Sequence, residues 1–194
     1  MKALYYIIQW TWGLPMNLLG VVAFVVARLC QWEYYWYRNA ICIVVPWNFG
    51  GMEMGMFFVR GQANESVSAH EYGHSIQNLW WGPLFPIVIA MPSAFRYWTR
   101  TKDSTISKRN FSCIVCGIAA ALGAIITVVS ALLLQFWLSI IGILIILYAG
   151  LMFVWMVVIE IPKYKEYVKY DAVWFEGQAT ELGNKANQNA WTWL

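Results

Sequence analysis

Apolar residues dominate the first thirty positions of the chain. Residues 3–29 are almost all apolar or aromatic, and this run exceeds the ~20 residues that a helix needs to cross a bilayer. It is too long and too aromatic for the core of a signal peptide, and no small-residue cleavage site follows it. We therefore predict a retained transmembrane helix over residues 1–30, with a kink where Pro15 and Asn17 interrupt it.

A second apolar region covers residues 111–160 and is divided only by a short turn near Gln135. Both halves are rich in glycine, alanine and serine, which allow membrane helices to pack closely. The pattern predicts a transmembrane hairpin. Cys113 and Cys116 form a C-x-x-C pair inside it with no second pair, so we interpret them as ordinary packing residues.

Two shorter runs between these regions have the composition of strands. Residues 41–45 are β-branched and end at Pro46, and residues 52–60 form a second apolar run. A glycine-containing turn sequence separates them. We predict a small β-hairpin over residues 41–60. The aromatic stretch at residues 32–38 is expected at the membrane interface.

A polar stripe marks the next predicted element. Residues 64–80 are predicted to be helical, and Gly82-Pro83 breaks that helix before an apolar continuation to residue 99. We therefore predict a helical hairpin over residues 64–99. A polar stripe on a lipid-compatible helix should face a buried site. The stripe consists of His70, Glu71, His74, Gln77 and Asn78. Residues 163–190 are polar and predict a C-terminal helix.

The composition agrees with a membrane protein. The 194 residues are 60% hydrophobic and 12% charged, whereas about a quarter of the residues in soluble domains are charged. The predicted fold class is therefore mainly α: a polytopic membrane protein with a small β-hairpin before the motif helix, built as one membrane-embedded domain over residues 1–194. Thirteen tryptophans and eleven tyrosines fit interfacial aromatic belts, so membrane lipids are expected partners.

Charge bears on orientation and on partners. The net charge is only +3 and no nucleic-acid-binding pattern is present, so we expect no nucleic acid partner. Basic residues cluster after the first apolar run, around residues 96–109 and at residues 163–169. All three clusters can lie in the cytoplasm under the positive-inside rule, which places the polar stripe toward the cytoplasmic side. No feature of the sequence indicates an oligomeric state.

Both histidines of the chain fall in the string His70-Glu71-Tyr72-Gly73-His74. This is the H-E-x-x-H pattern, in which two imidazoles one helical turn apart can bind one zinc ion. Glu71 stands where it can act as general base toward water on the metal. The alternative interpretation is a polar helix turn inside the core.

A catalytic zinc site normally has a third protein ligand and one water. With no further histidine, the third ligand must be a carboxylate or a cysteine. Glu176 is the preferred candidate, because Gly177, Ala179 and Gly183 would let its helix approach another closely. Glu181 and Asp171 remain open as alternatives.

The second motif resembles that of gluzincins, zinc peptidases that pair H-E-x-x-H with a downstream E-x-x-A. Glu176-x-x-Ala179-x-x-x-Gly183 is similar to the E-x-x-A-D-x-x-G string of two membrane-embedded groups, the type I CAAX prenyl proteases and the bacterial heat-shock membrane proteases. The resemblance implies that Glu176 is the third ligand. Thr180 departs from it, since the motif has aspartate there; that leaves open which residue orients a zinc-bound histidine, with Glu181 or Asp171 as candidates.

A closer likeness is to a group of small bacterial membrane proteins. It covers most of the chain except residues 111–160, and it implies a bacterial cytoplasmic-membrane protein. The shared strings are Gly13 to Gly20, Gly51 to Gly61, His70 to Gln77, Gly82 to Leu84 and Trp174 to Gly183.

These motifs predict a zinc metallopeptidase whose substrate is a peptide or a membrane protein. Zinc held by His70, His74 and Glu176 would lower the pKa of its bound water toward ~7, and Glu71 would take the proton and deliver it to the leaving amine. The second predicted strand, through Met54, Gly55, Met56 and Phe57, is expected to bind an extended peptide by β-addition; alternatively it only braces the fold. Tyr167 and Tyr170, with Tyr164, are candidate oxyanion donors or interfacial anchors.

Three other functions are alternatives to this prediction. The site-2 protease class also uses H-E-x-x-H, but it takes its third ligand from an N-P-D-G or L-D-G string, and neither occurs here. A zinc-binding membrane protein without turnover, such as a scaffold or an immunity factor, is a second possibility, and a zinc hydrolase of lipid or of another amide is a third. Glu71 favours catalysis, because a purely structural zinc site needs no general base.

Overall fold

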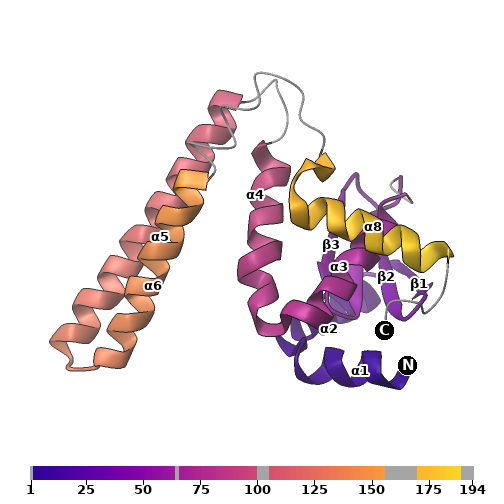
Figure 1. Ribbon diagram of the computed structural model, residues 1–194, viewed down its shortest axis with the longest axis horizontal. Helices are drawn as coiled ribbons and strands as arrows, with labels where there is room; N and C mark the ends of the chain where they lie inside the picture. The colour runs from indigo at the N-terminus through magenta and orange to yellow at the C-terminus, as the bar shows by residue number, and fades with distance from the viewer. Residues whose placement is uncertain (1, 64–65, 100–104, 156–169, 189–194) are drawn as a thin grey trace. The chain divides into compact units, whose positions relative to one another are not determined.

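The computed structural model describes residues 2–63, 66–99, 105–155 and 170–188. The chain forms two compact units (Figure 1), whereas the sequence predicted one domain. One unit comprises Met1–Met91 with Tyr170–Leu194, and the other comprises Pro92–Lys169. We call the first the motif unit, because it contains both sequence motifs, H-E-x-x-H and E-x-x-A.

The second unit is helical, with α4 over Met91–Thr99, α5 over Thr105–Leu132 and α6 over Phe136–Phe153. Two segments, Cys113–Leu132 and Phe136–Phe153, are long and apolar enough to cross a membrane. They confirm the apolar helix pair predicted over residues 111–160 as far as the structure describes it. Cys116 is buried against Met152 in the packed interior, which agrees with an ordinary packing role.

The first apolar run is not one helix. It forms α1 over Lys2–Thr11 and α2 over Leu14–Leu29, and the two helices meet at 93°. Pro15 lies in the first turn of α2, where a backbone N–H has no hydrogen-bond acceptor within the helix. The Asn17 side-chain amide donates at 2.6 Å to the carbonyl oxygen of Gln9, in the last turn of α1, and at 3.0 Å to that of Gly13, the N-cap of α2. The kink predicted at Pro15 and Asn17 is therefore present, and it is a right-angled bend between two separate helices.

The predicted β-hairpin over residues 41–60 was wrong in its pairing. Four strands form one sheet in the order β1-β2-β4-β3, and β2 pairs with β4 in parallel. The second predicted strand is itself a hairpin, because Gly55 adopts a positive φ of 73° and turns the chain between β3 and β4. The strands are β1 Glu33–Tyr37, β2 Ala40–Val45, β3 Gly51–Met54 and β4 Phe57–Gly61. The aromatic stretch thus forms the edge strand β1, which pairs antiparallel with β2.

Two helices complete the motif unit. The motif helix α3 covers Val67–Trp81 and packs on the sheet and against α8, which covers Trp174–Gln188 after the short helix η5 at Tyr170–Ala172. Gly82 ends α3 with a positive φ of 48°, as the predicted break requires. Short helices η1 at Gly82–Leu84 and η2 at Pro86–Ala90 lead to α4. Residues 64–65, 163–169 and 189–190 of the predicted helices lie outside the described residues. The core between sheet and helices consists of Ala40, Cys42, Val44, Phe58, Tyr72, Ile76, Leu182 and Ala186.

Candidate metal centre

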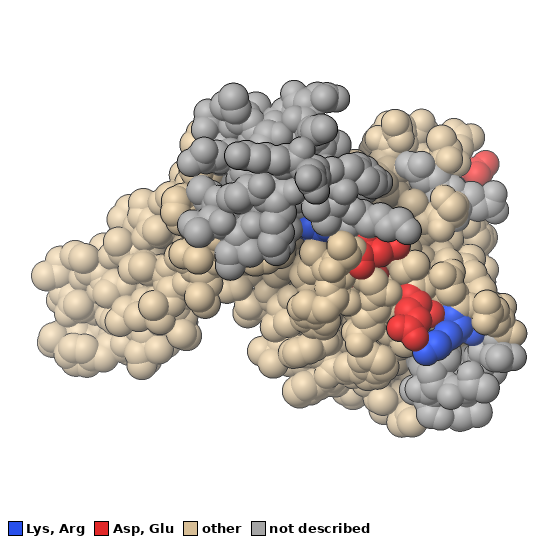
Figure 2. Space-filling view, turned by 45° about the horizontal axis from the view of Figure 1, so that its top comes forward, with Lys and Arg blue, Asp and Glu red and all other residues tan. Residues whose placement is uncertain are grey.

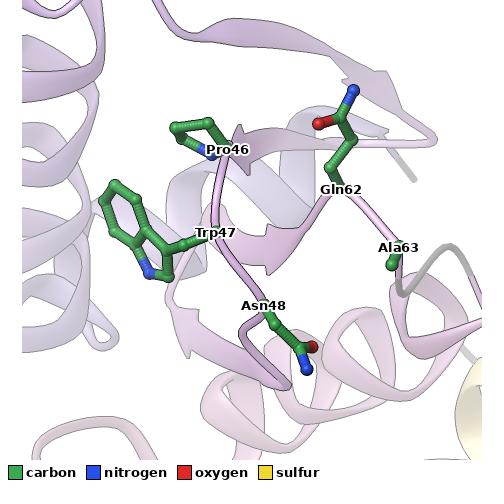
Figure 3. A pocket seen from close by; sticks show the side chains of 5 residues that line it. All are labelled: Pro46, Trp47, Asn48, Gln62 and Ala63. Atoms are coloured by element: carbon green, nitrogen blue, oxygen red, sulfur yellow. The ribbon is translucent and has the colours of Figure 1, made fainter.

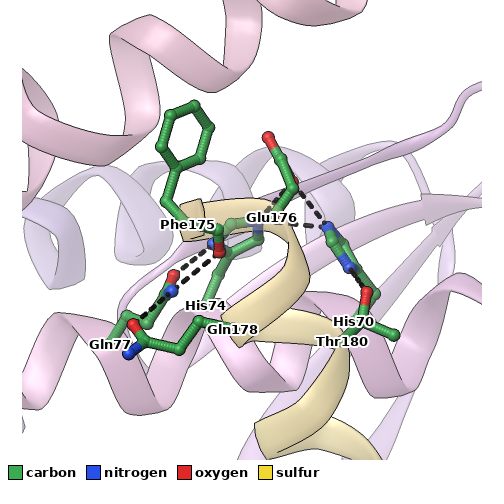
Figure 4. Close-up of polar contacts among 7 residues, drawn as sticks. All are labelled: His70, His74, Gln77, Phe175, Glu176, Gln178 and Thr180. Atoms are coloured by element: carbon green, nitrogen blue, oxygen red, sulfur yellow. Dashed lines mark hydrogen bonds and ion pairs between the residues drawn. The ribbon is translucent and has the colours of Figure 1, made fainter. Parts of the chain in front are cut away.

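The two imidazoles of α3 and one carboxylate of α8 meet at a single point (Figure 4). His70 and His74 project from successive turns on one helix face, with ring centroids 4.7 Å apart. Glu176, in the first turn of α8, lies with Oε2 3.0 Å from Nε2 of His70 and 3.2 Å from Nε2 of His74. The two Nε2 atoms are 3.1 Å apart. These three atoms form a nearly equilateral triangle.

The size of this triangle suits a metal ion. Ligand distances of about 2.0–2.1 Å in a tetrahedral zinc site place neighbouring ligand atoms roughly 3.3 Å apart, close to the observed edges. Among the described residues, the group of possible ligands is these three side chains. The group can hold a metal ion, and three protein ligands leave one tetrahedral position for solvent or substrate.

Glu176 is the carboxylate that the structure places against the two histidines. Its side chain is fully buried. The two alternatives lie elsewhere: Asp171 is exposed, and Glu181 is exposed and paired with Lys185 at 2.5 Å. Neither reaches the imidazole pair.

Both histidines are oriented through their second ring nitrogen. Nδ1 of His74 lies 2.7 Å from Oε1 of Gln77, whose amide nitrogen donates to the carbonyl oxygen of Phe175 at 2.8 Å. Because Oε1 can only accept, we assign the proton of His74 to Nδ1. Nδ1 of His70 lies 2.9 Å from the hydroxyl of Thr180, which can donate or accept a hydrogen bond. If Nε2 of His70 binds a metal ion, Nδ1 carries the proton and the Thr180 hydroxyl accepts it. Both Nε2 lone pairs would then face the Glu176 carboxylate, and a cation among the three groups would make this convergence favourable.

Thr180 and Gln77 are the functional residues that the sequence interpretation missed. Thr180 stands where the gluzincin-like motif has aspartate, and it takes the role for which Glu181 and Asp171 were considered. Helical spacing was the available signal, because Thr180 follows Glu176 by one turn and Gln77 follows His74 by three residues.

Small residues bring the two helices together. A Cβ on Gly73 would overlap the carbonyl oxygen of Ala179, and one on Gly183 would overlap that of Ala69. The close approach predicted from Gly177, Ala179 and Gly183 is confirmed at Ala179 and Gly183, and Gly73 leaves the matching space in α3. Gly177 instead lies against the backbone of Asp171. This crossing sets the distance between Glu176 and the imidazoles.

Glu71 lies beside the metal-ligand group and is almost completely buried, at 5% exposure. Burial raises its pKa to about 7; the charge of His70 opposes this shift, the charge of Glu176 adds to it, and the backbone N–H of Glu53 opposes it by donating to the carboxylate. A side chain on Gly51 would overlap the Glu71 carboxyl group. The strand β3 therefore runs directly past Glu71.

The four residues predicted to bind substrate do not line this approach. Met54, Gly55, Met56 and Phe57 are all buried, in the β3–β4 turn and at the start of β4. The amide of Met56 donates to Oδ1 of Asn17 in α2 at 2.8 Å. The prediction that these four residues bind substrate was wrong because the turn at Gly55 folds this segment under α2. The part of β3 that faces Glu71 is its beginning, Gly51 to Glu53.

Glu53 is a second buried carboxyl group beside Glu71, and the sequence did not indicate it. It is 5% exposed, and its Oε1 accepts the N–H of Gly55 at 2.5 Å, while Oε2 is buried without a hydrogen-bond partner. Burial raises its pKa well above the usual value, the Gly55 N–H opposes the shift, and the nearby charge of Glu71 adds to it.

Tyr170 is the candidate oxyanion donor that the structure places near the centre. Its ring centroid lies 5.8 Å from that of His70. Tyr164 and Tyr167 lie outside the described residues. A separate shallow pocket of about 260 Å³ lies at the ends of β2 and β4 (Figure 3). It is lined by Pro46, Trp47, Asn48, Gln62 and Ala63, none of which is titratable.

Comparison of the chain with family models, with curated proteins and with solved structures gives no match.

Proposed function

We propose that the protein is a zinc-dependent membrane metallopeptidase that hydrolyses a peptide bond with Glu71 as general base. One observation carries the proposal: His70 Nε2, His74 Nε2 and Glu176 Oε2 converge at 3.0–3.2 Å with a buried carboxyl group, Glu71, beside them. Imidazole and carboxylate ligands suit zinc. The two apolar helices of the second unit support placement in a membrane.

Each side chain then has a defined role. Bound zinc would supply a Lewis acid that lowers the pKa of water to near neutrality. His70, His74 and Glu176 hold the ion, and Thr180 and Gln77 fix the imidazole orientation. The Glu71 carboxylate accepts the proton of the attacking water and returns it to the leaving amine. In the metal-free protein burial raises the pKa of Glu71 to about 7. A zinc ion held nearby would lower that pKa and so favour the carboxylate, the form that a general base needs.

The edge of β3 is the proposed substrate contact. Among the described strands, β3 pairs only with β4, so its other edge has no strand partner. The N–H of Glu53 points to Glu71 and therefore away from β4. Gly51, two residues earlier, presents its backbone on the same side. An extended peptide or a segment of a membrane protein could pair there by β-addition and pass Glu71.

For location we propose a bacterial cytoplasmic membrane, with the centre toward the cytoplasm. Arg28 and Arg38 flank the start of the sheet, and Lys185 lies on α8. These basic residues support that orientation under the positive-inside rule.

The experiment combines metal content with hydrolysis of casein-derived peptides by the purified protein in detergent. Wild type should bind about one zinc per chain and cleave. Glu71→Gln should retain the zinc and lose cleavage, and His70→Ala should lose the zinc. Cleavage by Glu71→Gln at the wild-type rate would reject the base role. Zinc bound by wild type without any hydrolysis of the peptide mixture would favour the non-catalytic alternative.

A further inference from the structure

The helices α1 and α2 bury their polar side chains and expose their apolar ones, the opposite of what is expected for helices that face water. Their polar side chains Gln9 and Asn17 are 0% exposed, as is Tyr5. Their apolar side chains point outward, with Val22 62% exposed and Leu29 79% exposed. The outward residues recur along both helices: Leu4, Ile7, Trp10, Leu14, Leu18, Leu19, Val22, Val25, Val26 and Leu29. We call these ten residues the apolar face.

The buried polar groups fix the bend between the two helices. The side-chain amide of Gln9 donates to the carbonyl oxygen of Ser75 in α3 at 2.9 Å. Its Oε1 accepts from Asn17 at 2.9 Å and from Asn78 at 2.8 Å. Tyr5 and Ser75 share a further hydrogen bond of 2.6 Å. Straightening the pair would break this buried network, so the bend belongs to the folded protein.

Neither helix is long enough to cross a bilayer. With 10 and 16 residues, α1 and α2 extend about 15 Å and about 24 Å, below the ~30 Å of a hydrocarbon core. Each helix also packs against the rest of the motif unit. Gly20 of α2 lies against Met54 and Phe57 of the sheet, and α1 is bonded to α3. The two helices therefore form one surface of the motif unit.

The motif unit is polar on another side. Apart from Trp174 at its start, the exposed residues of α8 are polar: Glu181, Asn184, Lys185, Asn187 and Gln188. The helix α3 lies between α8 and α1 (Figure 1). In the space-filling view the charged side chains are few and gathered in small groups (Figure 2). The unit thus has an apolar side and a hydrated side.

Lipid is the occupant that fits the apolar face. Basic residues stand near its two ends, Lys2 and Arg28, and neither helix contains an acidic residue, which suits anionic headgroups. Trp10 and Trp12 are exposed beside the bend, as is typical of side chains at a membrane interface. The chain also carries two helices apolar enough to hold it at a membrane.

We propose that α1 and α2 insert the apolar face into one leaflet of a bilayer without crossing it, so that the motif unit lies on the membrane surface. The consequence is that the N-terminal end of α1 and the hydrated side of α8 share one side of the membrane. This contradicts the crossing predicted for residues 1–30, and it does not depend on the proposed hydrolysis.

Cysteine labelling of the full-length protein in sealed native membranes tests the proposal. The parent carries Cys30→Ser, because Cys30 is the exposed cysteine among the described residues. Ala3→Cys at the start of α1 and Lys185→Cys on α8 should react with a membrane-impermeant maleimide from the same side. Val22→Cys should not react with the maleimide in intact membranes, and it should react after the membranes are dissolved in detergent. Labelling of Ala3→Cys and Lys185→Cys from opposite sides, or of Val22→Cys in intact membranes, would overturn the proposal.

Depth-dependent quenching provides the second measurement. A fluorophore on Val22→Cys should be quenched more by a nitroxide near the lipid carbonyl than by one at the acyl-chain end. Leu122→Cys, outward-facing within the apolar segment of α5, is the matched control and should show the opposite order. A chain-end preference at Val22→Cys contradicts the one-leaflet arrangement. So does a disulfide-linked dimer through Val22→Cys, since a second copy would then cover the face.

Discussion

The hydroxyl of Thr180 lies 2.9 Å from Nδ1 of His70 and stands one helical turn after Glu176. A single helix, α8, therefore supplies one ligand of the candidate centre and orients another. In metal sites such partners fix the ring tautomer and increase the basicity of the ligand nitrogen.

Thr180→Val should weaken metal binding because it removes the acceptor of the His70 proton and keeps the side-chain shape. The expected loss is about 10–100-fold in zinc affinity, as for other partners of metal-bound histidines. Competition with a chromophoric chelator measures it. Thr180→Ser keeps the hydroxyl and should bind zinc like wild type. Equal affinities for wild type and Thr180→Val would show that the contact does not orient His70.

Gly73→Ala tests the helix crossing. The new methyl group would meet the Ala179 carbonyl oxygen, so α8 must shift and carry Glu176 away from the imidazoles. Overpacking of this kind costs about 1–3 kcal/mol, and zinc affinity should fall as well. Thermal unfolding and zinc titration measure the two effects.

Gly117→Ala is the control for that substitution, because its Cβ meets nothing within 4 Å. It should leave both stability and zinc affinity close to those of wild type. If Gly73→Ala behaves in the same way, α8 does not need its close approach to α3 to form the centre.

The sequence predicted the ligands better than it predicted their surroundings. His70, Glu71 and His74 follow from spacing on one helix, and Glu176 follows from small neighbours that permit close packing. Partner residues are harder, because Thr180 and Gln77 resemble any polar residues on a helix until the opposite helix is in place. Local sequence patterns therefore identify candidate metal ligands more readily than the residues that hydrogen-bond to those ligands.

The strand pairing was mispredicted, and the kink between α1 and α2 was predicted without its size, for a related reason. The pairing of β2 with β4 depends on a tight turn at Gly55 inside an apolar run, and residue counting treats that run as one strand. The right angle between α1 and α2 depends on Asn17 and Gln9, whose hydrogen bonds run between helices. Both features arise from tertiary contacts that override a local pattern.

Glu53→Ala should destabilise the turn behind the candidate centre. It removes the acceptor of the Gly55 N–H and leaves that buried donor unpaired, which costs about 1–3 kcal/mol. Denaturant unfolding at pH 6 measures the loss. Glu53→Gln retains an oxygen acceptor and should lie closer to wild type. Equal destabilisation by both variants would mean that the carboxylic acid itself, rather than the acceptor, holds the turn.

The stability of the metal-free protein should decrease as pH rises from about 5 to about 7. Burial raises the pKa of Glu71 from 4.5 to about 7. Between these values the unfolded chain has released the proton and the folded chain still holds it. The folded state binds more protons there, so the free energy of unfolding falls with rising pH. The fall is on the order of 3 kcal/mol for this group, and Glu53, whose pKa is also raised, adds to it in the same direction.

Unfolding of chelator-treated protein at pH 5, 6, 7 and 8 measures this slope. Glu71→Gln is the control, because it has the same shape without a titrating group, and its slope should be shallower than that of wild type by the Glu71 contribution. The difference should vanish below pH 4.5, where both states of the wild type hold the proton. A wild-type slope equal to that of Glu71→Gln would mean that the carboxyl group is hydrated in the folded protein, in contradiction to its burial behind β3.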